Sequence, residues 1–186
     1  MLRAKIKKEK KYYLLPSIIT YTNMLLGILA IWLSCTLEIK SISISCILII
    51  FAAVTDKIDG FVARKLNMTS KFGKELDSLC DLVSFGLAPI MIWWNINHGY
   101  FRIMEVIISL LFIGAGVFRL ARYNIEEDND YIKGLPITIA GGIVVSKHFI
   151  DINYRFQSKL LLFNEDIIML TLLSIFMVSR IRIKKP

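Results

Sequence analysis

The chain has 186 residues, 55% of them hydrophobic, and a mean hydropathy of +0.59. This hydropathy excludes an ordinary soluble domain, and the length corresponds to a single domain. The net charge of +8 would suit a nucleic-acid-binding protein. However, the basic residues gather at the ends of apolar stretches, as topology signals do, so we expect no nucleic acid partner. The three cysteines are scattered through apolar stretches and predict neither a disulfide framework nor a zinc site.

Six apolar stretches follow one another along the chain, each near the ~20 residues that a membrane-spanning helix needs. They are residues 16–36, 42–61, 77–96, 104–121, 136–153 and 165–181. We therefore predict an all-α integral membrane protein with six transmembrane helices. Residues 1–186 would form one membrane domain, whose basic N-terminal segment (1–14) either lies on anionic lipid headgroups or is a solvated tail.

The Lys and Arg residues predict the orientation of the chain. Seventeen of the 23 belong to one side: six before the first stretch, four between the second and third, three between the fourth and fifth, and four at the C-terminal end. Because basic residues mark cytoplasmic loops, we expect both termini to be cytoplasmic. This makes the chain a multi-pass protein of the cell membrane.

Four aspartates stand at the ends of the second and third stretches. Asp56 and Asp59 are three residues apart, and Asp77 and Asp81 are four apart, so each pair shares one face if it lies on a helix. We expect the third helix to begin at about Asp77. The two helices would then bring four carboxylates together at the cytoplasmic edge of the membrane.

Four carboxylates at a membrane edge need positive charge to neutralise them, which two divalent cations would supply. All-oxygen ligands suit Mg²⁺, Mn²⁺ or Ca²⁺, and two such ions form the usual clamp for in-line phosphoryl transfer. A divalent-cation or proton transporter is an alternative, because acids within membranes often mark ion paths. A transporter should carry its acids near the midplane of repeated halves, whereas these lie at one edge and no repeat is evident.

Other polar residues lie along the remaining helices. Thr20, Asn23 and Gly27 form a small polar stripe on the first helix, which suits either helix packing or ligand contact. We interpret Lys147 and His148 as snorkelling or packing residues at the outer end, without an acidic neighbour at helical spacing.

The acidic stretch resembles a known family. Residues 56–81 match the signature D-x2-D-G-x2-A-R-x8-G-x3-D-x3-D of the CDP-alcohol phosphotransferases at every position. Within that family the chain resembles the phosphatidylserine synthase branch, through FGKELDSLCDLVSFGLAP, RLARYN, GLPITIAGG and the opening LPSIITYTN. Together these segments cover the first five predicted helices. Ser17 departs from the opening motif, which often has Asn there.

The resemblance implies a transferase of phospholipid biosynthesis. The hydroxyl of L-serine would attack the phosphorus that bears the lipid of a CDP-diacylglycerol-type substrate, releasing CMP and forming phosphatidylserine or its ether-lipid equivalent. Two Mg²⁺ or Mn²⁺ ions would be the cofactors, with Ca²⁺ as another possible occupant. Transfer to another alcohol, such as glycerol phosphate or inositol phosphate, is the alternative within the family.

The resemblance also implies roles for individual residues and a homodimeric assembly. Asp81 would complete the second metal site and act as general base on the acceptor hydroxyl. The residues implied are, for the metals, Asp56, Asp59, Asp77 and Asp81; for the CDP group, Thr20, Asn23, Gly60, Ala63, Arg64 and Gly73; and for the serine carboxylate or lipid phosphate, Arg119, Arg122 and Asn124.

Overall fold

A computed structural model describes residues 20–65, 71–97, 103–125, 131–154 and 159–184. Within these ranges, the side chains of residues 59–65, 71, 131–132, 159–160 and 182–184 are outside the description. The basic segment predicted at residues 1–14 lies outside the described residues.

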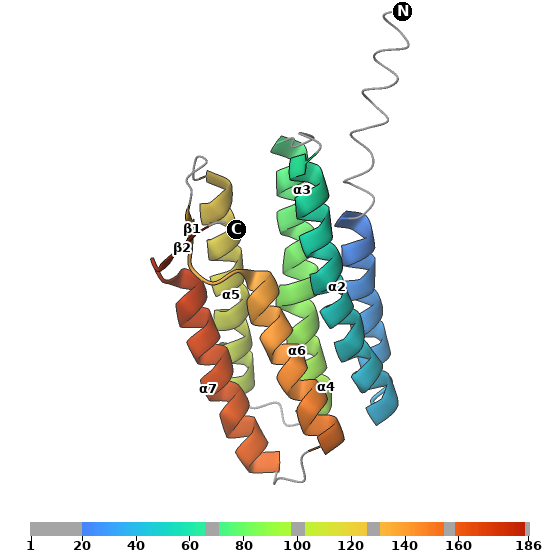
Figure 1. Cartoon of the computed structure of the whole chain (residues 1–186). Helices are drawn as coiled ribbons and strands as arrows, with labels where there is room; N and C mark the ends of the chain where they lie inside the picture. Colours follow the sequence, from blue (N-terminus) through green and yellow to red (C-terminus); the bar gives the residue numbers. More distant parts are fainter. Residues whose placement is uncertain (1–19, 66–70, 98–102, 126–130, 155–158, 185–186) are drawn as a thin grey trace, which may run out of the picture.

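The described chain forms six helical segments that run side by side and alternate in direction (Figure 1). As a result, the first described helix begins at the same end of the bundle at which α7 ends. For these residues the prediction of six helices is confirmed. The segments are Thr20–Ser34, α2 (Ile39–Lys65), a continuous run of α3 (Lys71–Asp81), the π-helix η1 (Leu82–Leu87) and α4 (Ala88–Asn97), then α5 (Ile103–Ile125), α6 (Ile137–Tyr154) and α7 (Lys159–Val178).

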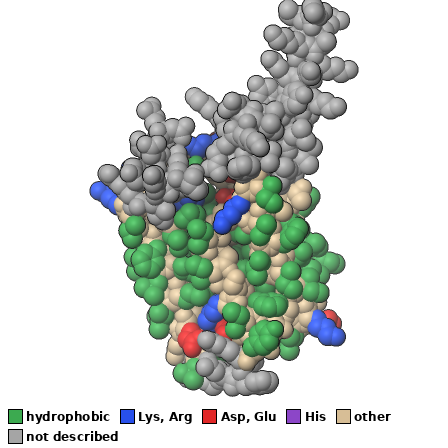
Figure 2. All heavy atoms as spheres, in the orientation of Figure 1, with side chains coloured by type: hydrophobic (Ala, Val, Ile, Leu, Met, Phe, Trp, Pro, Cys, Tyr) green, Lys and Arg blue, Asp and Glu red, His purple; other side chains and the backbone are tan. Residues whose placement is uncertain are grey.

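Four helices in the described part of the chain are long and apolar enough to cross a membrane. They span Ile39–Ile58, Phe72–Asn97, Ile103–Ile125 and Leu161–Val178. Hydrophobic side chains cover the visible flank of the bundle, and charged side chains gather toward its two ends (Figure 2). This distribution is that of a helical membrane protein whose flank faces lipid.

Two short strands lie at one end of the bundle. The strand β1 (Tyr131–Lys133) pairs antiparallel with β2 (Arg182–Lys184), so that Lys133 lies opposite Arg182. The pair lies beside the ends of α5 and α7 (Figure 1). The sequence did not predict these strands. They join the segment before α6 to the segment after α7.

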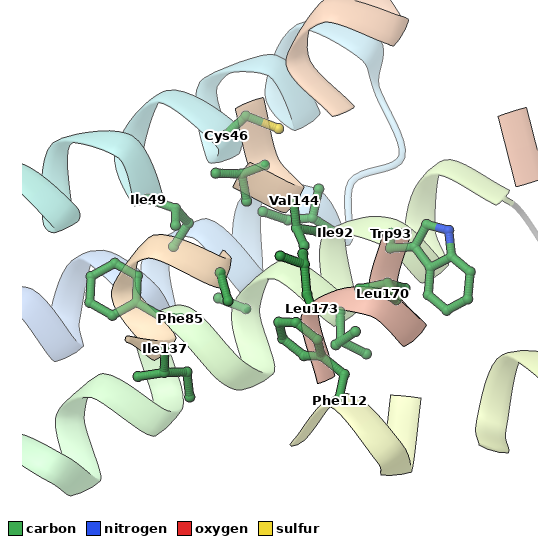
Figure 3. Packing of buried hydrophobic residues seen from close by; sticks show 14 of the residues in the cluster. Cys46, Ile49, Phe85, Ile92, Trp93, Phe112, Ile137, Val144, Leu170 and Leu173 are labelled. Atoms are coloured by element: carbon green, nitrogen blue, oxygen red, sulfur yellow. The ribbon is translucent and has the colours of Figure 1, made fainter. Parts of the chain in front are cut away.

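The interior of the bundle is filled by side chains from α2, η1, α4, α5, α6 and α7 that point toward one another (Figure 3). Phe85, Phe112, Ile137, Val144 and Leu170 are fully buried. The most extensive pairings are α5 with α7 and α2 with α6. Because lipid is as apolar as these side chains, close packing rather than hydrophobic burial holds such helices together.

The third helix begins earlier than predicted. We expected a start near Asp77, but α3 begins at Lys71. Its first turns carry the polar residues Lys74 and Glu75, which hydropathy excluded from the span. The Lys74 ammonium donates a hydrogen bond to the Tyr123 carbonyl at 3.0 Å, at the end of α5. This contact to another helix explains why a polar segment continues the helix.

The π-helix η1 follows Asp81 directly. Its Ser84 hydroxyl donates to the Asn23 carbonyl at 3.0 Å. A Cβ on Gly27 would lie 2.8 Å from Ser84 Cα, so only glycine allows this approach of the first helix. The packing interpretation of Gly27 therefore holds, and the tight contact lies three residues after Asp81. Short π-helical segments occur frequently at functional sites.

The prediction that Lys147 and His148 have no acidic neighbour at helical spacing is wrong, whereas His148 is buried as a packing residue would be. Asp151 stands one turn after Lys147, and its carboxylate lies 2.7 Å from the Lys147 ammonium. Across the helix pair, the same ammonium donates to Asp166 of α7. His148 Nε2 lies 3.4 Å from that carboxylate, and Trp93 of α4 donates its indole N–H to it at 2.9 Å. These residues form a buried network, at the end of the bundle opposite Asp56, that joins α4, α6 and α7.

Candidate active site

Three carboxylates from two helices lie close together toward the end of the bundle that carries β1 and β2. Asp56 comes from α2, and Asp77 and Asp81 come from α3. One oxygen of each lies within 4.8 Å of the others. The helical spacing predicted this meeting, because Asp77 and Asp81 are one turn apart and face α2 together.

For four further residues of the signature, in the last turns of α2, the structure describes only the backbone. Asp59, Gly60, Ala63 and Arg64 are helical there, and their side chains lie outside the description. Gly73 lies in the first turn of α3 and is half-buried. The helical backbone puts Asp59 one turn beyond Asp56 on the same face of α2.

Asp81 is the most enclosed of the three carboxylates, with 7% of its surface exposed. Its Oδ1 atom is buried and has no hydrogen-bond partner among the described residues. Arg119 of α5, also 7% exposed, interacts electrostatically with both Asp81 and Asp56. A buried carboxylate oxygen that lacks a donor is stabilised by a cation, a ligand or a proton.

This donor set fits a divalent metal ion. The three carboxylates supply oxygen ligands, which suit Mg²⁺, Mn²⁺ or Ca²⁺ and do not favour zinc. Their separation lets one ion contact all three. Three acids this close would repel one another without positive charge between them.

Two residues predicted to contact the CDP group lie on the first helix. Thr20 and Asn23 are buried, and Asn23 Oδ1 has no hydrogen-bond partner in the described part of the chain. The Asn23 carbonyl accepts the bond from Ser84 described above. This helix is therefore docked beside η1, which directly follows α3.

The three residues predicted to contact serine or the lipid phosphate differ in their surroundings. Arg119 stacks its guanidinium over the Tyr123 ring at 5.4 Å, and its Nε is buried without a described partner. Asn124 donates at 3.0 Å to Glu75 and to Ser78 of α3. These bonds tie the end of α5 to the helix that carries Asp77 and Asp81.

Arg122 binds main-chain carbonyls. Its guanidinium donates to Lys133 at 2.9 Å, to Val178 at 3.0 Å and to Ser179 at 3.1 Å. Carbonyls at a helix C-terminus lack partners within the helix, and a cation there also complements the helix dipole. Arg122 thus caps α7 and holds strand β1 against it.

Sequence reasoning missed Thr138. It lies in the first turn of α6, and its hydroxyl donates to Asp56 Oδ2 at 3.3 Å. The partners are 82 residues apart, so no helical spacing could connect them. The GLPITIAGG segment that contains Thr138 was recognised only as a family motif.

The fold and the site define a helical membrane protein with a cluster of three aspartates, able to hold a metal ion, at one end of its bundle. Residues 13–150 match the family model for CDP-alcohol phosphatidyltransferase. This match covers most of the chain and includes all three clustered aspartates, and the chain belongs to this family.

Similar proteins come from bacteria, archaea and yeast. A CDP-diacylglycerol–serine O-phosphatidyltransferase of Helicobacter pylori is 35% identical over 177 residues, which cover 91% of this chain and 71% of that protein. The Bacillus subtilis protein of the same name is 35% identical over 73% of this chain and 75% of its own length. An archaetidylserine synthase of Methanothermobacter thermautotrophicus is 34% identical over 75% of this chain and 60% of its own.

Proposed function

We propose that this protein transfers a phosphatidyl group, or its ether-lipid equivalent, from a CDP-activated lipid to the hydroxyl of L-serine. The carrying observation is the meeting of Asp56, Asp77 and Asp81 within 4.8 Å inside a complete family signature. The names of the similar proteins support serine as the acceptor. The products are CMP and phosphatidylserine or archaetidylserine.

The reaction forms one bond and breaks one. The serine oxygen bonds to the phosphorus that carries the lipid, and the bond from that phosphorus to the bridging oxygen breaks. CMP leaves with that oxygen, and the hydroxyl proton passes to Asp81. Divalent cations held by Asp56, Asp59, Asp77 and Asp81 would neutralise the carboxylates and the negative charge of the diphosphate.

Asp81 suits the role of general base because of its surroundings. Its Oδ1 is buried and lacks a described donor, so this oxygen can accept a proton. Thr20, Asn23, Gly60, Ala63, Arg64 and Gly73 would surround the CDP group. Asn23 supports this assignment through its own buried oxygen.

We assign different tasks to the three residues at the end of α5. Arg119 would bind the serine carboxylate or the lipid phosphate directly, because its Nε is buried without a described partner near the aspartates. Arg122 and Asn124 would hold the surrounding helices, since their donors already bind α7, β1 and α3. The active site would face the cytoplasm, and the protein would form a homodimer.

The test is CMP release by purified protein from a CDP-activated lipid with Mn²⁺ or Mg²⁺. L-serine, glycerol 3-phosphate, inositol phosphate and no acceptor are compared. Release that requires both serine and the metal is the expected result. Release only with a phosphorylated alcohol would keep the family and overturn serine as acceptor, whereas no release with any acceptor would refute the proposal.

A further inference from the structure

We propose that Thr138 is a positioning residue for Asp56: its hydroxyl holds this carboxylate in the orientation that binds the metal ion. The inference rests on the proposed metal site and adds a residue that the family signature, residues 56–81, does not contain. Its basis is the hydrogen bond of 3.3 Å from Thr138 Oγ1 to Asp56 Oδ2, which joins α6 to α2.

The Thr138 side chain is held firmly enough for this task. It is only 9% exposed and stands between Ile137 and Ala140, which are fully buried. A β-branched side chain in a helix has few allowed rotamers. Of the two rotamers open to a helical threonine, the one present directs the hydroxyl to Asp56.

Two other threonine hydroxyls, on α2 and α7, bond within their own helix. Thr171 donates to the Ile167 carbonyl at 2.7 Å, and Thr55 donates to the Ala52 carbonyl at 2.9 Å. Thr138 lies in the first turn of α6, where residues 134 and 135, four and three positions earlier, both precede the helix and supply no helical carbonyl. Its hydroxyl is therefore available to a carboxylate from another helix.

The segment before α6 fixes the position of its first turn along the bundle. Gly134 adopts φ +76° and donates its N–H to the Ile181 carbonyl at 2.9 Å. The Arg122 guanidinium holds the Lys133 carbonyl at 2.9 Å. Together these bonds dock the first turn of α6 on the ends of α5 and α7, which sets the position of Thr138 relative to Asp56.

A hydroxyl suits this position better than a charged donor. Asp56 shares its surroundings with two other carboxylates, Asp77 and Asp81. A lysine or arginine would bind Asp56 but compete with the metal for it. A neutral hydroxyl orients the carboxylate and leaves the negative charge for the ion.

The experiment measures Mn²⁺ binding to purified protein in detergent micelles, with free Mn²⁺ followed by electron paramagnetic resonance. Thr138→Val keeps the side-chain shape and removes the hydroxyl, whereas Thr138→Ser keeps the hydroxyl. Loss of an outer-shell partner typically weakens metal affinity about 10- to 100-fold. We expect that increase in the Mn²⁺ Kd for Thr138→Val, and a Kd near that of the unmodified protein for Thr138→Ser.

Thr171→Val is the matched control, because it makes the same chemical change where the hydroxyl bonds the Ile167 carbonyl of its own helix. Its Kd should not change. The serine KM at saturating Mn²⁺ should also stay constant in Thr138→Val. A raised serine KM with an unchanged Mn²⁺ Kd would overturn the inference in favour of a substrate contact.

Asp56→Asn separates failure of this inference from failure of the proposed metal site. If Asp56→Asn abolishes Mn²⁺ binding and Thr138→Val leaves the Kd unchanged, the metal site stands and the positioning role is refuted. If neither variant changes the Kd, the metal site at Asp56 is refuted as well. Should Thr138→Val not fold, Thr138→Ala replaces it under the same criteria.

Discussion

Replacing Lys147 with methionine should destabilise the protein at the end of the bundle opposite the aspartate site. The variant removes an ammonium that binds Asp151 at 2.7 Å and also binds Asp166. The two carboxylate side chains are 9% and 5% exposed, so water cannot replace the lost partner. Methionine fills a similar volume, which keeps the packing change small.

The magnitude follows from burial. Removing one partner of a buried ion pair costs about 3–5 kcal/mol in the free energy of unfolding. Asp166 keeps the N–H of Trp93 as a donor, and Lys147 is itself 17% exposed, so the lower end applies. About 3 kcal/mol corresponds to a Tm lower by roughly 6–12 °C in a chain of this size.

The assay is thermal unfolding in detergent micelles, followed by circular dichroism at one fixed heating rate. Lys40→Met is the control, because Lys40 is exposed at the start of α2 near the same end of the bundle. Its Tm should stay close to that of the unmodified protein. A decrease below about 3 °C for Lys147→Met, near 1 kcal/mol, would contradict the reasoning.

Three further predictions concern the aspartate end. Asp81→Asn should keep nucleotide and metal binding, while turnover measured as steady-state CMP release falls at least ~100-fold. Near-normal turnover would exclude Asp81 as the general base. Arg119→Ala should raise the serine KM, whereas Arg180→Ala, at an exposed position after α7, should not; equal KM values would remove Arg119 from the serine site. Gly134→Ala should lower the Tm, because its Cβ would lie 2.3 Å from the Met177 carbonyl oxygen. Gly142→Ala, which meets nothing within 4 Å, should not lower it, and equal Tm values would contradict this account.

The sequence predicted those parts of the site that depend on local periodicity. Asp77 and Asp81 share one face of α3 because they are one helical turn apart, and hydropathy located the helices that carry the acids. The prediction failed for the first turns of α3. Lys74 and Asn124 belong to different helices, and their polar contacts are visible only after the chain folds.

Contacts between distant segments account for the other differences. Asp166 reaches Lys147 from α7, and Thr138 reaches Asp56 from α6, so neither contact follows from spacing along one helix. Asp151 is a different case, because it lies four residues after Lys147 and inspection at helical spacing could have found it. The β1–β2 pair was not predicted, because a strand of three residues is too short to show an alternating pattern in the sequence.

The hydrogen bond between Thr138 and Asp56 also has a consequence for the order of assembly. Chains are synthesised from the N-terminus, so α2 and α3 leave the ribosome before α6. The aspartates therefore reach the membrane before Thr138, which lies 82 residues after Asp56 in the sequence and orients it, has left the ribosome. A nascent chain that stops before α6 has all the signature acids and lacks the contact from Thr138. Completion of the metal site is thus linked to insertion of the fifth helical segment, late in biogenesis.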